Sequence, residues 1–279
     1  MIVVTGATGN VGRALVEALA AAGEDVTAVS RRAPEAALPA GVRHRVGDLG
    51  RPVELKAVFD GADAVFLLVA GVGEELRPRE IVDAAVAAGV RRLVLQSSQL
   101  LGTRPESVSH APLRNFEAAV RGSGLEWTVL RPSGFASNAF MWAESVRTAR
   151  SVAAPFADVA MPVVDPADIA DVAAAVLREG VHHGRTYVLT GPAAVTPREQ
   201  AAALAGAVGA PVRFVAQSRA EARAELVRFL PEVAVDGMLA VMGEPRADER
   251  RVSPDVERVL GRPGRPFSAW AERNAFAFA

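Results

Sequence analysis

The turn that follows the first apolar segment constrains the fold of this chain more than any other feature. Residues 2–4 are apolar, residues 5–12 read TGATGNVG, and residues 13–22 alternate apolar and polar side chains at helical spacing. A strand, a glycine turn and a helix in this order place a pyrophosphate at a helix N-terminus, where unpaired N–H groups and the helix dipole favour negative charge. The alternative is an ordinary strand–helix turn. The residues expected to hold the phosphates are Gly6, Thr8, Gly9, Asn10, Val11 and Gly12.

The three glycines have different expected roles. Gly6 allows the tight turn, Gly9 lets the backbone approach the phosphates, and Gly12 lets the helix pack closely on its strand.

The composition of the 279 residues excludes several classes of function. The net charge is −1 and there is no long basic run, so neither nucleic acid nor a membrane surface is expected as a partner. The chain has no cysteine, which excludes disulfides, thiolate metal sites and a cysteine nucleophile. The first strand starts at Ile2 without a signal peptide, and the apolar runs are too short to span a bilayer, so we expect a cytoplasmic protein.

Strands and helices alternate along the first two-thirds of the chain. Apolar strands are expected at 25–29, 42–46, 64–69, 92–96, 127–130 and 186–189, with helices at 53–59, 79–88, 112–121 and 168–178. This alternation predicts an α/β fold with a doubly wound parallel sheet of Rossmann type. We expect residues 1–132 to form the dinucleotide-binding core. Residues 133–279 should complete the sheet and form a small, mostly helical subdomain that covers the substrate, with 155–166 as a loop.

Several motifs together point to a known family. The TGATGNVG turn has the spacing G-x-x-G-x-x-G, Gly47-Asp48-Leu49 follows the third strand, and Ser97-Ser98 follows the fifth. Further motifs are SGLEWTVLRP at 123–132, DPADIA at 165–170, LTGP at 189–192 and VLGRP at 259–263. Together they resemble the NmrA-like atypical short-chain dehydrogenase/reductases. That family includes NAD(P)H:quinone and azo reductases, and also nucleotide-binding regulators without catalytic activity.

The end of the second strand indicates which nucleotide is bound. An acidic residue there would bind the ribose of NAD, whereas this chain has Arg31 and Arg32. Guanidinium groups suit a 2′-phosphate, and the hydroxyl of Ser30 could add a donor. NADP(H) is therefore the expected cofactor, with NAD(H) possible. The alternative is that both arginines are solvated loop charges.

Other cofactor contacts are assigned from the resemblance and from strand order. Asp48 and Leu49 resemble the family's adenine-contacting pair, although Asp48 could instead stabilise a turn or cap a helix. Val69 and Ala70 follow the fourth strand, where small residues let the chain pass close to the ribose and nicotinamide.

The proton relay of typical short-chain dehydrogenases is missing. Those enzymes use Tyr-x-x-x-Lys, and the corresponding positions here are Ser109 and Leu113. The only lysine and the only tyrosine, Lys56 and Tyr187, lie in other elements. His110 is the best available proton donor, unless it only faces solvent. Ser97 could hydrogen-bond a substrate oxygen, or could satisfy only backbone groups.

An aromatic segment after residue 134 is the candidate substrate site. Its expected contacts are Phe135, Asn138, Phe140 and Trp142. An ordinary apolar core is the alternative for these rings. The apolar segment 238–242 could form a lid. His182-His183 is interpreted as a surface turn, so no metal is expected.

These features favour an NAD(P)H-dependent oxidoreductase that transfers hydride to a planar quinone-like or aromatic small molecule. Two alternatives remain open: a regulator that binds NAD(P) without turnover, and a tailoring enzyme of secondary metabolism. The sequence makes no prediction of the oligomeric state.

Overall fold

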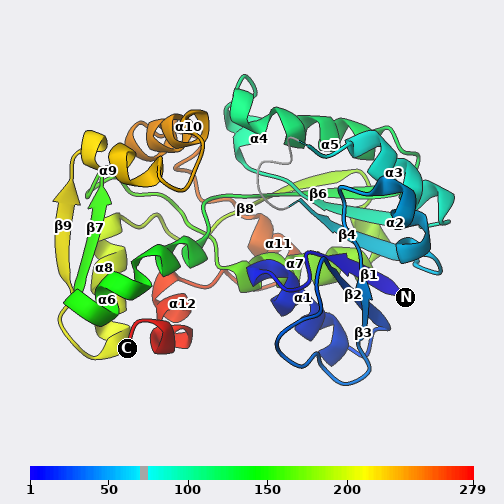
Figure 1. Ribbon diagram of the computed structural model, residues 1–279, viewed down its shortest axis with the longest axis horizontal. Helices are drawn as coiled ribbons and strands as arrows, with labels where there is room; N and C mark the ends of the chain where they lie inside the picture. Colours follow the sequence, from blue (N-terminus) through cyan, green and yellow to red (C-terminus); the bar gives the residue numbers. More distant parts are fainter. Residues whose placement is uncertain (70–74) are drawn as a thin grey trace. The chain divides into compact units, whose positions relative to one another are not determined.

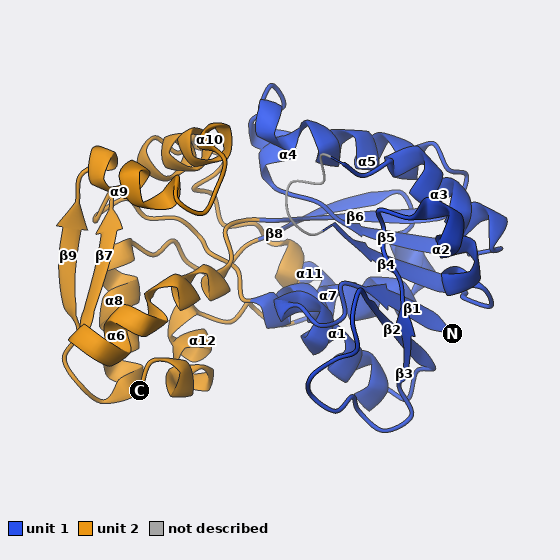
Figure 2. Cartoon of the chain, in the orientation of Figure 1, with its two compact units in different colours: residues 1–132, 166–189, 258–261 blue, residues 133–165, 190–257, 262–279 orange. Residues whose placement is uncertain are grey.

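The computed structural model describes residues 1–69 and 75–279, which form two compact units (Figures 1 and 2). Unit 1 contains residues 1–132, 166–189 and 258–261, and unit 2 contains residues 133–165, 190–257 and 262–279. No helix in the described parts of the chain is long and apolar enough to cross a membrane.

Unit 1 is built on a seven-stranded parallel sheet in the order β3-β2-β1-β4-β5-β6-β8. The predicted doubly wound α/β fold is confirmed. The strands are β1 (Ile2–Thr5), β2 (Val26–Ser30), β3 (Arg43–Val46), β4 (Ala64–Leu68), β5 (Arg92–Gln96), β6 (Glu126–Pro132) and β8 (Arg185–Leu189). Because β1 to β5 run between covering helices, most of them are continuous apolar segments.

Two helical layers cover this sheet. On one face α1 (Asn10–Ala21) packs against α7 (Pro166–Arg178), and on the other α2 (Pro52–Phe59), α3 (Pro78–Ala87) and α5 (Ala111–Arg121) lie side by side. The second layer encloses a core of fully buried side chains that includes Leu55, Ile81, Leu93, Leu95 and Phe116. The short helix α4 (Leu100–Thr103) follows β5, and the 3₁₀ turns η1 (Val108–His110) and η3 (Gly180–His182) precede α5 and β8.

Unit 2 combines helices with a two-stranded parallel sheet that the sequence analysis did not predict. The strands are β7 (Ser151–Pro155) and β9 (Arg213–Gln217). The helices are η2 (Ala136–Trp142), α6 (Ala143–Ala149), α8 (Pro197–Val208), α9 (Arg219–Leu226), α10 (Glu232–Gly243), α12 (Phe267–Arg273) and η4 (Ala275–Ala277), while α11 (Asp255–Leu260) is shared with unit 1. Its core contains Trp142, Leu204, Phe267, Trp270 and Phe278.

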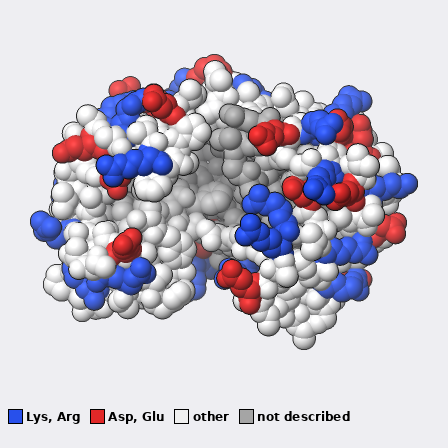
Figure 3. All heavy atoms as spheres, in the orientation of Figure 1, with Lys and Arg blue, Asp and Glu red and all other residues white. Residues whose placement is uncertain are grey.

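Charged side chains are mixed by sign on the face drawn in Figure 3. Many exposed arginines have a carboxylate partner, such as Asp25 for Arg43 and Asp158 for Arg198. This mixture fits the net charge of −1.

Candidate cofactor and active site

The glycine turn between β1 and α1 has the geometry of an anion cradle. Gly6 has a φ of +63°, a left-handed conformation that favours glycine. A Cβ on Gly12 would lie 2.1 Å from the carbonyl oxygen of Gly6, so only glycine allows α1 to begin this close to the turn. Gly9 is the N-cap of α1, and the first turn has neither a side-chain cap nor an acidic residue. The N–H groups of Asn10, Val11 and Gly12 are therefore open to a phosphate.

A cavity of about 1000 Å³ adjoins this turn within unit 1. Arg31 and Arg32, which directly follow β2, line it together with Thr8 and with Arg13 of α1. The other lining residues are Ala7, Val16, Glu17, Ser30 and the segment 33–39. Sequence reasoning missed Arg13 and the segment 33–39, although Arg13 faces the cavity from the helix that the glycine motif starts. The turn and the cavity together fit a dinucleotide that carries a 2′-phosphate.

The hydroxyl of Ser30 is not available as a phosphate donor. Its proton goes to the carbonyl oxygen of Arg32, 2.7 Å away, and the same oxygen lies 2.8 Å from Nε2 of His44. Since a hydroxyl has one proton, Ser30 accepts from His44. The expectation that Ser30 donates to the cofactor is corrected accordingly.

The predicted adenine and nicotinamide contacts lie at the carboxyl ends of their strands. Oδ1 of Asp48 accepts from the backbone N–H of Gly50 at 2.9 Å, so this side chain stabilises a turn. The N-cap position of α2 is occupied by Arg51, which makes no side-chain capping hydrogen bond. Leu49 packs against the core of unit 1, and Val69 directly follows β4. Ala70 lies outside the described residues.

The hydroxyl of Ser97 belongs to a buried ionic network at the end of β5. It donates to Oε1 of Glu117 at 2.7 Å, and Arg131 binds both oxygens of that carboxylate at 2.8 and 2.7 Å. Arg121 adds a contact at 2.7 Å. Burial alone would raise the pKa of Glu117, but the hydrogen bonds from the two arginines and Ser97 outweigh it and lower the pKa. Ser97 can therefore accept a hydrogen bond from a ligand, but its own proton is already bound to Glu117.

The last residue of β5 presents an acceptor beside this network. Oε1 of Gln96 is buried and has no hydrogen-bond partner among the described residues. A buried polar atom normally has a partner, so this oxygen fits a site that a ligand completes.

His110 ends the turn η1 and is half-buried at the start of α5. Its Nδ1 lies 3.0 Å from the hydroxyl of Ser109. Burial lowers the pKa of His110 below 6.5, and the positive charge of Arg114 lowers it further. The imidazole is therefore neutral at pH 7. Its catalytic role stays a prediction.

The structure separates the single lysine and the single tyrosine. Lys56 is exposed on α2, whereas the hydroxyl of Tyr187, on β8, lies 2.8 Å from Nδ1 of His182. His182 is buried, so the surface-turn interpretation of His182-His183 is wrong for its first residue. Among residues 1–69 and 75–279, no cluster of His, Cys, Asp or Glu could hold a metal ion.

The predicted substrate residues begin unit 2. Phe135 is half-buried and Asn138 is exposed. Phe140 stacks on Phe278 at 5.9 Å between ring centroids, and Trp142 is buried in the same core. For these two rings, the packing favours the alternative of an ordinary apolar core. Phe135 and Asn138 stay accessible to a ligand.

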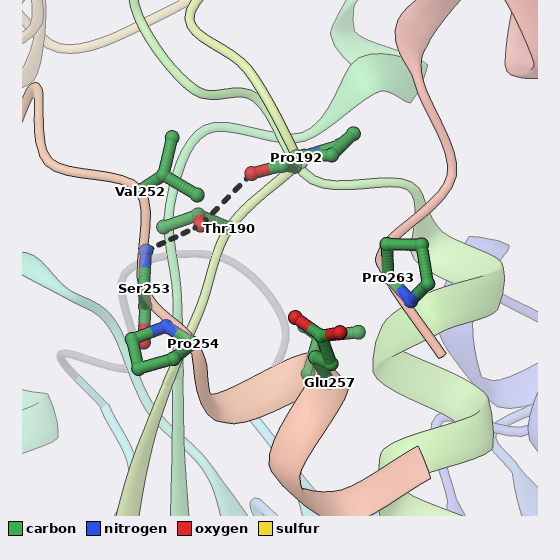
Figure 4. Close-up of a pocket in the computed structure, with 10 residues that line it drawn as sticks. Thr190, Pro192, Val252, Ser253, Pro254, Glu257 and Pro263 are labelled. Atoms are coloured by element: carbon green, nitrogen blue, oxygen red, sulfur yellow. Dashed lines mark hydrogen bonds between the residues drawn. The ribbon is translucent and has the colours of Figure 1, made fainter. Parts of the chain in front are cut away.

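Unit 2 also has a small pocket of about 260 Å³ (Figure 4). Oγ1 of Thr190 donates to the carbonyl oxygen of Gly191 and accepts from the N–H of Ser253, each at 3.0 Å. These bonds join the segment after β8 to the segment before α11.

Comparison with known proteins agrees with this geometry. A family model described as NAD(P)H-binding matches residues 6–180. The chain is 39% identical to a (4-alkanoyl-5-oxo-2,5-dihydrofuran-3-yl)methyl phosphate reductase of Streptomyces griseus, over 100% of this chain and 99% of that protein. It is 33% identical to an NAD(P)H azoreductase of Xenophilus azovorans, with the same coverage.

A solved structure shows the same fold. It is the NADPH complex of an NADPH-dependent quinone oxidoreductase from Escherichia coli, with a TM-score of 0.80 and 24% identity over 98% of this chain and 99% of that one. The family model and the two full-length relatives decide the assignment: the chain belongs to the NAD(P)H-binding family, as an NmrA-like atypical short-chain dehydrogenase/reductase, and is an NAD(P)H-dependent oxidoreductase.

Proposed function

We propose that this protein uses NADPH to reduce a planar, conjugated small molecule whose own carbonyl or azo groups stabilise the incoming charge. One observation carries the proposal: the glycine cradle and an arginine-lined cavity lie together, with no Tyr–Lys pair to drive a demanding proton transfer. Small molecules, rather than nucleic acid, fit the mixed charges on the face drawn in Figure 3 and the net charge of −1.

The cofactor assignment rests on the end of β2. Arg31 and Arg32 stand where an acidic residue would select NAD, and both line the cavity beside the glycine turn. A guanidinium binds a 2′-phosphate by charge-assisted hydrogen bonds that NAD cannot form. NADP(H) is therefore favoured, and NAD(H) remains a weaker ligand because the amides of the turn bind either pyrophosphate.

The chain's own residues bind and orient the cofactor and the substrate, and they exclude water. Bound NADPH would supply the hydride. The first turn of α1 holds the pyrophosphate, and Asp48 is assigned to the adenine and Val69 to the nicotinamide side. Oε1 of Gln96 can accept from a ligand amide. Ser97 is an acceptor, since its proton is bound to Glu117.

A conjugated acceptor explains how reduction proceeds without the usual relay. Hydride adds to an electron-poor carbon or nitrogen, and the electron pair of the broken π bond moves to an oxygen or to the second nitrogen. That atom then takes a proton from water or from His110, so no strong acid is required at the moment of transfer. We assign the substrate-covering role to unit 2, with Phe135 and Asn138 as accessible contacts.

A second acceptor class is favoured by the relative at 39% identity. The name of its substrate describes a ring C=C bond that is conjugated to a lactone carbonyl and an alkanoyl carbonyl. Reduction of such a butenolide would be one example of the tailoring enzyme of secondary metabolism that the sequence left open. It uses the same hydride addition, with the charge delocalised onto the two carbonyl oxygens.

The test is consumption of NADPH by the purified protein. We expect loss of the reduced-nicotinamide absorbance with quinones, azo dyes or alkanoyl butenolide phosphates, the preferred class being the one with the highest kcat/KM. Tight NADPH binding without consumption across all three classes would refute the reductase and support the sensing regulator.

Cofactor choice has its own test. Arg31→Asp should weaken NADPH binding more than NADH binding, because the new carboxylate repels the 2′-phosphate. The matched control is Arg51→Asp, since Arg51 is exposed at the start of α2 and pairs with Glu54 rather than lining the cavity. Equal losses for both nucleotides in Arg31→Asp would contradict the assignment.

A further inference from the structure

We propose that Ser30 and His44 form a brace that fixes the arginine turn after β2, and that this brace makes His44 a positioning residue for NADPH selectivity. The inference rests on the proposed NADPH site and adds to it a residue of the neighbouring strand. The observation is a chain of two hydrogen bonds that runs from β3 through Ser30 to the carbonyl oxygen of Arg32.

The direction of each hydrogen bond follows from the atoms present. The carbonyl oxygen of Arg32 can only accept, so the single hydroxyl proton of Ser30 points to it across 2.7 Å. Nε2 of His44 must then carry the proton of the 2.8 Å contact and donate it to Ser30. This assigns the Nε2–H tautomer to neutral His44. The imidazolium would make the same bond.

The strand register brings the two side chains together. β2 and β3 are parallel neighbours at the edge of the sheet, with His44 opposite Ala28 and Val46 opposite Ser30. Side chains at alternate positions share a face, so His44 and Ser30 point to the same side, the side that α1 covers. Ser30 is only 8% exposed and lines the cavity, whereas His44 is not among the described residues that line it.

The brace matters because Arg31 and Arg32 are otherwise exposed. An exposed arginine loses considerable side-chain and backbone entropy when it is held on a phosphate. Ser30 binds the backbone two residues ahead and so sets the direction in which both arginines leave the strand. The backbone that carries both arginines is then partly ordered before the cofactor binds. This lowers the entropy cost of binding a 2′-phosphate and so favours NADPH.

The experiment measures the 2′-phosphate increment directly by calorimetry with 2′,5′-ADP and 5′-AMP as ligands. For His44→Ala and Ser30→Ala we expect the Kd for 2′,5′-ADP to rise by about fivefold to tenfold, the effect of one lost positioning bond, with the Kd for 5′-AMP nearly unchanged. The double variant should lose no more than either single variant, because both remove the same brace.

Conservative variants separate the brace from general packing. His44→Gln keeps an N–H near the position of Nε2 and should restore the affinity for 2′,5′-ADP, whereas His44→Asn places its amide near Nδ1 and should not. Arg43→Gln is the matched control on the same strand, since Arg43 pairs with Asp25 instead. It should bind both ligands as the wild type does.

Each other outcome overturns the brace. Unchanged binding of 2′,5′-ADP by His44→Ala shows that His44 has no role, and equal losses for both ligands show a packing role only. A loss in Ser30→Ala but not in His44→Ala shows that Ser30 contacts the phosphate itself. A wild-type protein that binds 2′,5′-ADP no better than 5′-AMP refutes the proposed NADPH site itself, which is a distinct result from failure of the variants.

Discussion

The substitution Gly12→Ala tests the cofactor cradle most directly. The new Cβ would lie 2.1 Å from the carbonyl oxygen of Gly6 and 2.8 Å from Cα of Ala7, whereas real Cβ contacts essentially never fall below 3.0 Å. Both neighbours are backbone atoms, so the start of α1 must move by about 1 Å rather than a side chain adjusting. Overpacking of this kind costs about 1–3 kcal/mol. For a chain of this size that lowers Tm by about 2–12 °C.

The same displacement moves the amides that we assign to the pyrophosphate. Hydrogen bonds to charged groups contribute about 1.5–3 kcal/mol each, so displacement that breaks one weakens NADPH binding by at least about tenfold. Calorimetric titration with NADPH and a thermal melt measure the two effects separately.

Gly9→Ala is the matched variant for this test. Its Cβ would lie 3.4 Å from the carbonyl oxygen of Gly6, an ordinary contact, and its backbone is extended, with φ −82° and ψ 176°. It should melt as the wild type does but bind NADPH less tightly, because the methyl group faces the phosphates. Wild-type melting and wild-type NADPH affinity in Gly12→Ala would refute the reasoning.

Three further predictions concern the groups around the predicted active site. Glu117→Gln should cost about 2–4 kcal/mol in a urea melt, because it leaves the half-buried Arg131 without its carboxylate. Because the pKa of Glu117 is lowered in the folded state, its ionised form stabilises the fold at a pH above the ordinary carboxyl pKa. This stabilisation is lost as the pH falls through the pKa of the folded state, so the stability of Glu117→Gln should depend less on acid. An acid transition equal to that of the wild type would contradict this prediction. If His110 donates the proton, kcat should rise as the pH falls through a value below 6.5, and His110→Ala should flatten this profile; an identical profile assigns the proton to water. Tyr187→Phe removes the hydrogen bond to His182 and should cost about 1 kcal/mol of stability with no change in kcat, and a large loss of kcat would show a catalytic tyrosine after all.

The sheet of unit 1 was predictable because its signals are local. The strand at 92–96 matches the observed β5 in both bounds, and the other six predicted strands differ only at their ends. Continuous apolar segments, glycine turns and covering helices all indicate the same arrangement there. The phosphate cradle was predictable for the same reason, since its strand, turn and helix are adjacent in the sequence.

The strands of unit 2 were not predictable by these means. β9 is only partly buried, so its residues show neither a continuous apolar segment nor a strict alternation. β7 lies between two residues with positive φ, Arg150 at 45° and Phe156 at 54°. Neither is glycine, the usual sign of such a conformation, so tertiary packing sets the turns on both sides of the strand.

The hydrogen-bond partners that redefine the candidate site were also hidden, because they join segments far apart in the sequence. Ser97 donates to a carboxylate 20 residues further on, and Ser30 accepts from a histidine 14 residues further on. The sequence places both hydroxyls correctly at strand ends but cannot show that their protons are already committed. In both positions a predicted ligand donor becomes an acceptor or a positioning group.

The lack of a free hydroxyl donor at these positions narrows the range of reductions that the protein can catalyse. Ser97, after β5, has donated its proton, His110 has a lowered pKa, and the hydroxyl of the single tyrosine, on β8, binds a buried histidine. A simple ketone would need a proton donor as its oxygen becomes an alkoxide, and none of these groups supplies one efficiently. A quinone, an azo compound or an alkanoyl butenolide delocalises the charge over conjugated atoms. Water can then protonate the product after the hydride transfer. The reductase should therefore discriminate between substrates by conjugation: it should reduce an enone or a quinone and leave the matching saturated ketone unreduced. Turnover of the saturated ketone at a comparable kcat/KM would show that another group of the protein donates the proton.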